Sequence, residues 1–418
     1  MTDSATGRAL PAADLKRLEA AIEEIMALAR AHGLDFFTMR FEICPAEVLY
    51  AFGAYGMPTR FSHWSFGKAY YLLKSQADLG LARIYELVIN SDPCYAFLLE
   101  SNTFLENRMV VAHVLGHSDF FKHNWRFRGT NRKMVDTMSA FADRVRQYEQ
   151  RYGRDVVERF LDAAMAVAEQ VDPFPGTRPD PRSDLPRFLL ERAADLADWQ
   201  RDILASLREE ALYFRPQMET KILNEGWASL WHARIMRQLE LTPAEAVEFA
   251  RLHAAVLAPN PAQLNPYRLG YALLESIEAR YGRERLFEVR SVETDVSLVR
   301  NYLTPELCAE LDLQIYAREG DGWETQDTDW TAVRDTLLRQ LENCGLPRIY
   351  AEDDNYRGRG ELFLRHGYDG VELDVTHLTH ALQHVQHIWG RPVHLETVHD
   401  GERALYTCDS AGNTSRVL

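Results

Sequence analysis

Apolar side chains recur every three to four residues through most of the first 255 positions, and this rhythm constrains the fold more than any other feature. In the first half it predicts helices over residues 15–31, 65–90, 95–121, 134–152 and 156–171. Five prolines then interrupt the pattern between residues 171 and 188. Helices are expected again from Leu189 to about Ala255, with a gap at Pro216. The pattern predicts a large helical body.

The pattern changes near Pro347. The segments "PRIYAED", "GELFLRH", "PVHLETV" and "RALYTCD" are short, alternating and rich in β-forming residues, and Asp400-Gly401 suits a hairpin turn. One helix, residues 375–389, lies among them, and two more are expected upstream over 269–281 and 304–318. We therefore expect a mainly α fold: a helical body over 1–255 with the metal site, a helical connecting region over 256–340, and a small C-terminal α+β domain over 341–418.

The composition indicates which kinds of binding partner and which cell compartment to expect. The formal net charge of -15 argues against broad binding to nucleic acid or to an anionic membrane surface. No apolar run reaches the roughly 20 residues that span a bilayer, and the N-terminus lacks a signal-peptide pattern. The five cysteines are scattered without a CxxC pair, which is typical of reduced thiols. These features predict a cytoplasmic protein that binds neither nucleic acid nor membrane.

Two histidines in "MVVAHVLGHSDFFKHN" are the first candidates for chemistry. His113 and His117 are four residues apart in an expected helix, so they share one face and could hold a metal ion. The alternative is a pair of hydrogen-bonded core histidines. In "KILNEGWASLWH", Glu225 and His232 are seven residues apart and also share a face. Zinc accepts two histidines and a carboxylate while keeping a position open for water.

The segment "LNEGWAS" resembles the "NEGFA" helix of the gluzincin aminopeptidases, where the glutamate completes a zinc site begun by HExxH. The resemblance implies a zincin-like arrangement in the helical body. Val114 occupies the position of the catalytic glutamate and can transfer no proton, so the base is relocated or missing. Glu86 is the preferred substitute, as base or further ligand; the alternative is an exposed helical glutamate.

Other polar residues could complete such a site. Arg60 could hold a substrate carboxylate, and His63 could shuttle a proton. Asp119 is a candidate to orient an imidazole, with a surface ion pair or a helix cap as the alternative for each of these residues. Four histidines of the C-terminal helix could chelate a metal or pack against a sheet: His377, His380, His384 and His387.

Six longer segments occur in an order that resembles the SpoVR family, the stage V sporulation protein R-like proteins, between about Asp35 and Thr397. They are "YGMPTRFSHWSFGKAY", "IYELVINSDPCYAFLLESNT", "VVAHVLGHSDFFKHN", "ALYFRPQMETKILNEGWASLWH", "NPYRLGYALLE" and "WGRPVHLET". The resemblance implies a role in sporulation and spore cortex formation. In bacteria that form no spores, it implies a stress response shared with a PrkA-type serine kinase and an associated protein.

Three functional hypotheses follow. The first is a zinc-dependent hydrolase of an amide or peptide bond, with peptidoglycan-related peptides as candidate substrates and with Glu86 or His63 moving protons. The second is a non-catalytic regulatory or adaptor protein acting with the kinase, which the missing base at Val114 favours. The third is a dinuclear oxidoreductase-like centre that shares five ligands between two metal ions: Glu86, His113, His117, Glu225 and His232.

Overall fold

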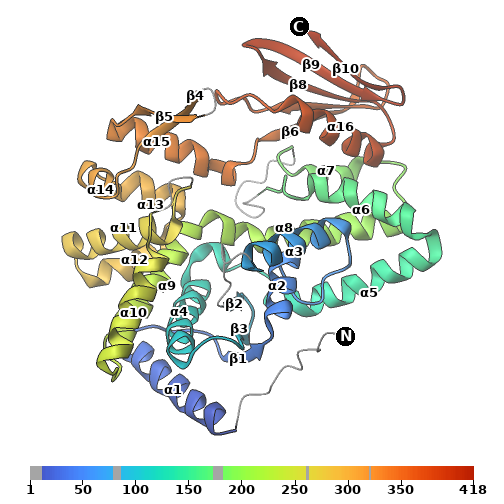
Figure 1. The fold of residues 1–418 in the computed structure, drawn as a ribbon. Helices are drawn as coiled ribbons and strands as arrows, with labels where there is room; N and C mark the ends of the chain where they lie inside the picture. Colours follow the sequence, from blue (N-terminus) through green and yellow to red (C-terminus); the bar gives the residue numbers. More distant parts are fainter. Residues whose placement is uncertain (1–11, 79–85, 173–181, 260–262, 320–321) are drawn as a thin grey trace. The chain divides into compact units, whose positions relative to one another are not determined.

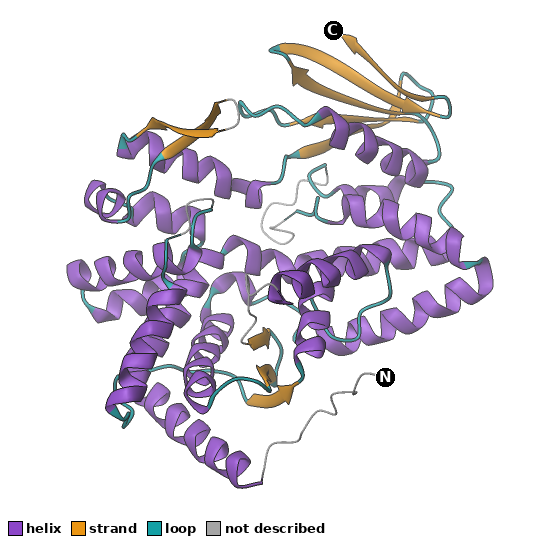
Figure 2. Ribbon diagram, in the orientation of Figure 1, coloured by secondary structure: helices purple, strands orange, loops and turns teal. Residues whose placement is uncertain are grey.

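The computed structural model describes residues 12–78, 86–172, 182–259, 263–319 and 322–418 (Figure 1). Helices make up most of it, and the largest group of strands lies in the C-terminal region (Figure 2). The expected fold class is confirmed: a mainly helical body with a small C-terminal α+β domain. The described residues form two compact units. One comprises those of Met1–Pro58, Trp64–Val135 and Pro216–Glu342, and the other those of Thr59–His63, Asp136–Arg215 and Asn343–Leu418.

The first unit contains most of the helices. Those before Val135 are α1 (Ala12–Ala31), α2 (Ala46–Tyr55), α3 (Trp64–Asp78), α4 (Phe104–His123) and the 3-10 turn η1 (Trp125–Phe127). Those after Pro216 are α9 (Lys221–Met236), α10 (Pro243–Val256), α11 (Pro266–Tyr281), α12 (Arg283–Val292), α13 (Asp295–Tyr302), α14 (Pro305–Glu310) and α15 (Trp330–Leu341). A short ribbon is made by β4 (Ile315–Glu319) and β5 (Gly322–Asp327).

A three-stranded sheet in this unit leads the chain into α4. Its order is β1 (Met39–Cys44), β3 (Cys94–Leu99), β2 (Glu86–Ile89), with β1 parallel and β2 antiparallel to β3. Ala96 and Leu98 of β3 belong to the core that contains α4, whereas Phe97 and Leu99 pack with α2. A capping box, in which Thr103 and Glu106 bond each other's backbone N–H, then starts α4.

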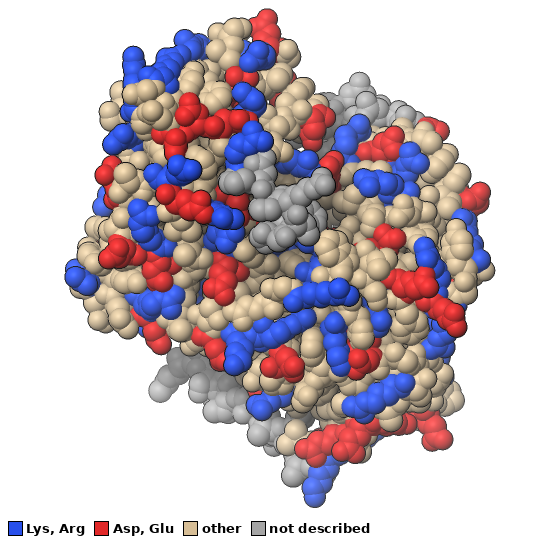
Figure 3. All heavy atoms as spheres, turned by 180° about the vertical axis from the view of Figure 1, so that it is seen from behind, with Lys and Arg blue, Asp and Glu red and all other residues tan. Residues whose placement is uncertain are grey.

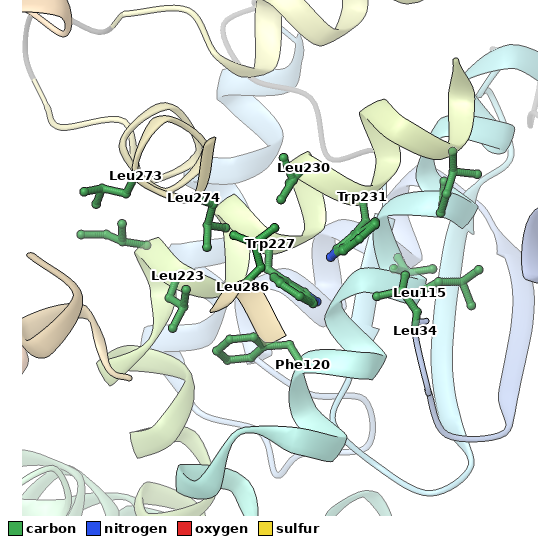
Figure 4. Packing of buried hydrophobic residues seen from close by; sticks show 14 of the residues in the cluster. Leu34, Leu115, Phe120, Leu223, Trp227, Leu230, Trp231, Leu273, Leu274 and Leu286 are labelled. Carbon is green, nitrogen blue, oxygen red and sulfur yellow. The ribbon is translucent and has the colours of Figure 1, made fainter. Parts of the chain in front are cut away.

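Helix α4 lies inside the core of the first unit. All its residues from Leu105 to Phe121 are buried, as expected of a helix surrounded by protein on every side. Helix α9 packs against α4, and α11 packs against α9. Figure 4 shows side chains of these helices meeting in one cluster, among them Leu115, Phe120, Trp227, Trp231, Leu273 and Leu274. Polar side chains on α4 therefore find their hydrogen-bond partners in the surrounding protein, as Asp119 and Ser118 do at the backbone N–H groups of Asp35 and Phe37.

The second unit combines helices with the C-terminal sheet. Its helices are α5 (Met134–Tyr152), α6 (Arg154–Ala168), α7 (Leu185–Arg192), most of α8 (Asp198–Glu219), the turn η2 (Glu342–Gly345) and α16 (Val375–Trp389). The sheet order is β10 (Gly412–Val417), β9 (Glu402–Asp409), β8 (Val393–His399), β7 (Glu361–His366), β6 (Ile349–Tyr356). Strands β7 and β8 are parallel, and α16 makes the crossover between them.

Several expected elements are confirmed at residue level, and others are wrong. Helices α5 and α16 have the expected bounds, and Asp400 and Gly401 form the hairpin turn with φ of +50° and +76°. Residues 86–89 and 94–99 are strands rather than parts of helices, because their short apolar runs pair with each other and with β1. Residues 315–319 form β4 instead of extending a helix from 304, and Pro216 lies inside α8.

Surface and thiol features complete the description. Basic and acidic side chains are interspersed over the face drawn in Figure 3. All five cysteines are free thiols. Among the described residues, no helix combines the length and hydropathy that crossing a membrane requires.

Candidate metal centre

Three side chains from two helices converge in the first unit. His113 and His117 extend from α4 and Glu225 extends from α9. The Nε2 atoms of the two imidazoles are 3.1 Å apart, and Glu225 Oε2 lies 3.4 Å from His117 Nε2 and 3.7 Å from His113 Nε2. Ligands held at 2.0–2.1 Å around one tetrahedral ion lie about 3.3 Å from each other. The observed separations bracket that value.

The hydrogen bonds around His117 determine which of its atoms faces the cluster. His117 Nδ1 lies 2.9 Å from the amide oxygen of Asn224, which can only accept, so Nδ1 donates and the neutral ring presents a lone pair at Nε2. Glu225 Oε2, which faces this lone pair, is buried and accepts no hydrogen bond of good geometry. Buried acceptors directed at one another need a shared cation or proton between them, and the donor set therefore fits a metal ion.

His113 is held from its opposite side by a chain of imidazoles. Its Nδ1 lies 2.9 Å from His232 Nδ1, and His232 Nε2 lies 2.9 Å from His253 Nδ1 on α10. If His113 offers its Nε2 lone pair to the cluster, Nδ1 donates to His232, which in turn donates to His253. The structure thus places His232 behind His113, and of the four proposed ligands His113, His117 and Glu225 are the three whose ligand atoms lie close together.

The ionisation states suit a ligand set. Burial raises the pKa of Glu225, but the two imidazoles beside it outweigh that effect and hold the pKa well below its usual range. Burial lowers the pKa of His232 well below its usual value, and the neighbouring imidazoles lower it further. An ionised carboxylate is the protonation state that a divalent metal requires of this ligand.

Glycines on α4, α9 and α11 let these helices approach one another closely beside the cluster. A Cβ atom on Gly226, next to Glu225, would lie 2.6 Å from Gly270 Cα on α11. A Cβ atom on Gly116, between the two histidines, would lie 2.8 Å from Ala228 Cα on α9. Because real Cβ atoms do not approach other atoms so closely, both positions require glycine where the helices cross. The glycines let α9 come near enough for Glu225 to reach the histidines.

Two buried aspartates fix the position of α9. Asp119 pairs with Arg290, with Nη1 2.8 Å from Oδ1, and its Oδ2 accepts from the indole N–H of Trp227. Asp295 accepts from the backbone N–H groups of Ile222 and Leu223 at the start of α9. Asp119 was expected to orient an imidazole; its oxygens bond the guanidinium, the indole and the backbone N–H of Asp35, and the imidazole of His123 lies 4.0 Å from Oδ1.

Each residue of the "NEGWA" segment makes a contact that accounts for its residue type. Asn224 orients His117, Glu225 faces the cluster, and Gly226 permits the crossing with α11. Trp227 bonds Asp119, and Ala228 meets Gly116. The roles of Asn224 and His253 were not anticipated from the sequence. Asn224 could have been found from its place beside Glu225, whereas nothing in the sequence near His253 indicated its contact.

The other candidate residues belong to several different segments of the chain. Arg60 and His63 belong to the second unit, where Arg60 pairs with Glu210 and His63 Nε2 lies 3.1 Å from Asp162. Glu86 is the first residue of β2, not a helical residue, and its side chain is outside the described part of the structure. Val114 is fully buried in the hydrophobic core. On α16, His377, His380 and His387 are exposed and His384 is half-buried.

Comparisons with known proteins agree along nearly the whole chain. The profile described as SpoVR like protein matches residues 12–180 and 174–346, and the profile of the SpoVR-like C-terminal domain matches residues 347–400. The chain is similar to the uncharacterized protein YcgB of Escherichia coli (strain K12), with 29% identity over 471 residues covering 91% of each chain. No solved structure matches the chain. The name of this relative states no activity, so the chemistry has to be inferred from the residues.

Proposed function

The chain belongs to the family of SpoVR-like proteins, and from its buried histidine and carboxylate cluster we propose that it is a metal-dependent hydrolase of amide bonds. The observation that carries the proposal is the convergence of His113 Nε2, His117 Nε2 and Glu225 Oε2 within 3.1 to 3.7 Å of one another. Zinc is the proposed metal because two imidazoles and one carboxylate form one of its common catalytic ligand sets.

The surrounding residues prepare the cluster for this role. Asn224 and His232 hold the second nitrogen of His117 and His113, which orients both rings toward the same point. Glu225 keeps 17% of its side-chain surface exposed, although the Oε2 atom that faces the cluster is buried. When bound, zinc with three protein ligands lowers the pKa of a water in its open position and polarises a carbonyl oxygen.

The substrate class that we propose is a small peptide, with peptidoglycan-related peptides as the first candidates. This choice rests on the family's association with cortex formation and stress. Glu86 is the proposed proton-transfer residue, since it begins β2 and this strand packs beside α4. Arg60 and His63 receive no comparable support, because each pairs with a residue of the second unit.

Metal analysis tests the ligand set directly. The full chain, purified with zinc and dialysed, is expected to retain about one zinc per chain by mass spectrometry of the elements. His113→Ala, His117→Ala and Glu225→Gln should each lose it while the far-UV circular dichroism is unchanged. His123→Ala is the matched control, because His123 lies on the same helix but bonds Asp35. Retention of zinc by all three variants would refute the ligand set.

Activity is tested separately. The zinc-loaded chain should cleave fluorogenic peptides from a panel that includes D-amino-acid-containing stem peptides. Glu225→Gln should abolish turnover, and Glu86→Gln should lower kcat by about 100-fold or more while zinc stays bound. Turnover that persists in Glu225→Gln preparations would point to a contaminating enzyme and contradict the hydrolase assignment.

A second function is favoured by one observation. Val114, at the position where zincins carry their base, is fully buried in the hydrophobic core. A chain that binds zinc without hydrolysing any peptide would be a regulatory or adaptor protein, for which a PrkA-type serine kinase is the proposed partner. Co-purification of the two proteins, retained in Glu225→Gln, would support this second function, and its absence would leave the hydrolase as the only proposal.

A further inference from the structure

A cavity of about 590 Å³ lies in the first unit, beside the beginning of α11 and against α15. Its volume falls within the range of small-molecule sites. Part of its wall is apolar and deeply buried, with Leu269, Leu311 and Val333 each less than a tenth exposed. Polar side chains line the rest, including the amides of Gln263 and Gln340. Such a mixed lining is typical of sites for amphiphilic small molecules.

Among its described lining residues, the cavity has one positively charged side chain. Arg268 is the only lysine or arginine among the described residues of the lining. It is half-buried, and within the described part of the chain no carboxylate or aromatic ring pairs with its guanidinium. Neighbouring arginines are paired: Arg234 with Glu278, and Arg280 of the same helix with Glu306. A half-buried guanidinium without a counterion is ready to bind an anion.

The other charged side chain of the lining limits how much negative charge the bound anion can carry. Asp312 also lines the cavity, where its carboxylate accepts from Gln314. A single arginine facing a single aspartate provides too little positive charge for a phosphate dianion. A carboxylate needs only one guanidinium, which it can engage in two-point fashion. The apolar wall would cover a hydrocarbon portion of the ligand, and the glutamine amides can pair with an amide group.

We propose that this cavity binds a small monocarboxylate with an apolar body, such as an N-acylated apolar amino acid, and that Arg268 holds its carboxylate. The site requires no metal and is independent of the hydrolase assignment. It nevertheless lies close to the cluster along the chain, because the preceding residue, Tyr267, stacks on the ring of His113 with centroids 6.1 Å apart.

Calorimetry on the full chain tests the proposal with N-acetyl-leucine, N-acetyl-phenylalanine and the neutral amides of both. At least one carboxylate should bind saturably and at least about tenfold more tightly than its amide. Arg268→Gln should weaken that binding about tenfold or more, and Arg268→Lys should weaken it less. Arg251→Gln is the control, because Arg251 pairs with Glu248 on α10 and should not matter.

Two further variants keep the test decisive. Thr336→Trp should fill the cavity and abolish binding without altering Arg268. Glu225→Gln, which should lose the zinc, should bind the probes like the wild type, and this separates the site from the metal cluster. Equal affinity for carboxylates and amides, binding that Arg268→Gln leaves unchanged, or no binding of either carboxylate would each overturn the proposal.

Discussion

Gly226 of α9 and Gly270 of α11 touch backbone to backbone, one residue from the carboxylate that completes the candidate metal centre. A Cβ atom on Gly226 would lie 2.6 Å from Gly270 Cα and 2.7 Å from its carbonyl oxygen. Since backbone atoms cannot move aside as a flexible side chain can, the helices have to separate if either glycine is replaced. The packing of α9 and the position of Glu225 are therefore linked.

Replacing Gly226 by alanine is expected to destabilise the protein, because the added methyl group forces α9 and α11 apart. Overpacking of this kind costs about 1–3 kcal/mol or more. Urea unfolding gives the change, and zinc content should fall with it. Gly67→Ala on α3 is the matched control: nothing lies within 4 Å of its Cβ position, so it should stabilise α3 by about 0.5–1 kcal/mol. Equal stability of the Gly226 variant and the wild type would disprove the link.

His232→Ala should separate a supporting role from a ligand role. If His232 only orients His113, the variant still binds one zinc at saturation, but its zinc affinity falls about 10–100-fold. His113→Ala, in contrast, should lose the stoichiometric zinc. Competition with a chromophoric chelator measures both affinities. A His232 variant that holds no zinc even at saturation would show instead that His232 is a ligand, as expected from its spacing to Glu225.

Arg290→Ala should be among the most damaging single substitutions. It leaves the fully buried carboxylate of Asp119 without its guanidinium, and breaking a buried ion pair in this way costs about 3–5 kcal/mol. Arg285→Ala in the same helix removes an exposed pair with Glu288 and a hydrogen bond to the Tyr302 hydroxyl, and it should cost much less. Chemical denaturation compares the two, and similar costs would contradict the buried role of Arg290.

The pH dependence of stability should include a contribution from His253. Burial, assisted by the positive charge of Arg237, lowers its pKa to about 4, from 6.5 in the unfolded chain. Between these values the unfolded state binds a proton that the folded state does not. The contribution to stability is therefore complete above pH 6.5 and is lost progressively as the pH falls toward 4.

Urea unfolding of the metal-free protein at pH 7 and pH 4.5 checks this expectation. His253→Gln removes the titrating group, so the wild type should lose more free energy of unfolding between the two pH values than the variant does. Parallel losses in the two proteins would show that His253 titrates normally in the folded state.

The sequence predicted those features that depend on local periodicity. The helices over 134–152 and 375–389 have their expected bounds because their apolar stripes and end signals lie within the segments themselves. The common face of His113 and His117 follows from the same 3.6-residue period. The strands at 86–89 and 94–99 were missed, because short apolar runs become strands only when they find partners in a sheet.

By itself, then, the sequence determined that two imidazoles would share a face of one helix and that a carboxylate of another helix was available to meet them. Only the tertiary structure decided which atoms face each other: Glu225 approaches the Nε2 atoms, His232 takes the opposite side of His113, and Asp119 pairs with Arg290. The reason is physical. Helical periodicity acts over a few residues, whereas these contacts depend on how closely glycines and buried ion pairs let distant helices approach.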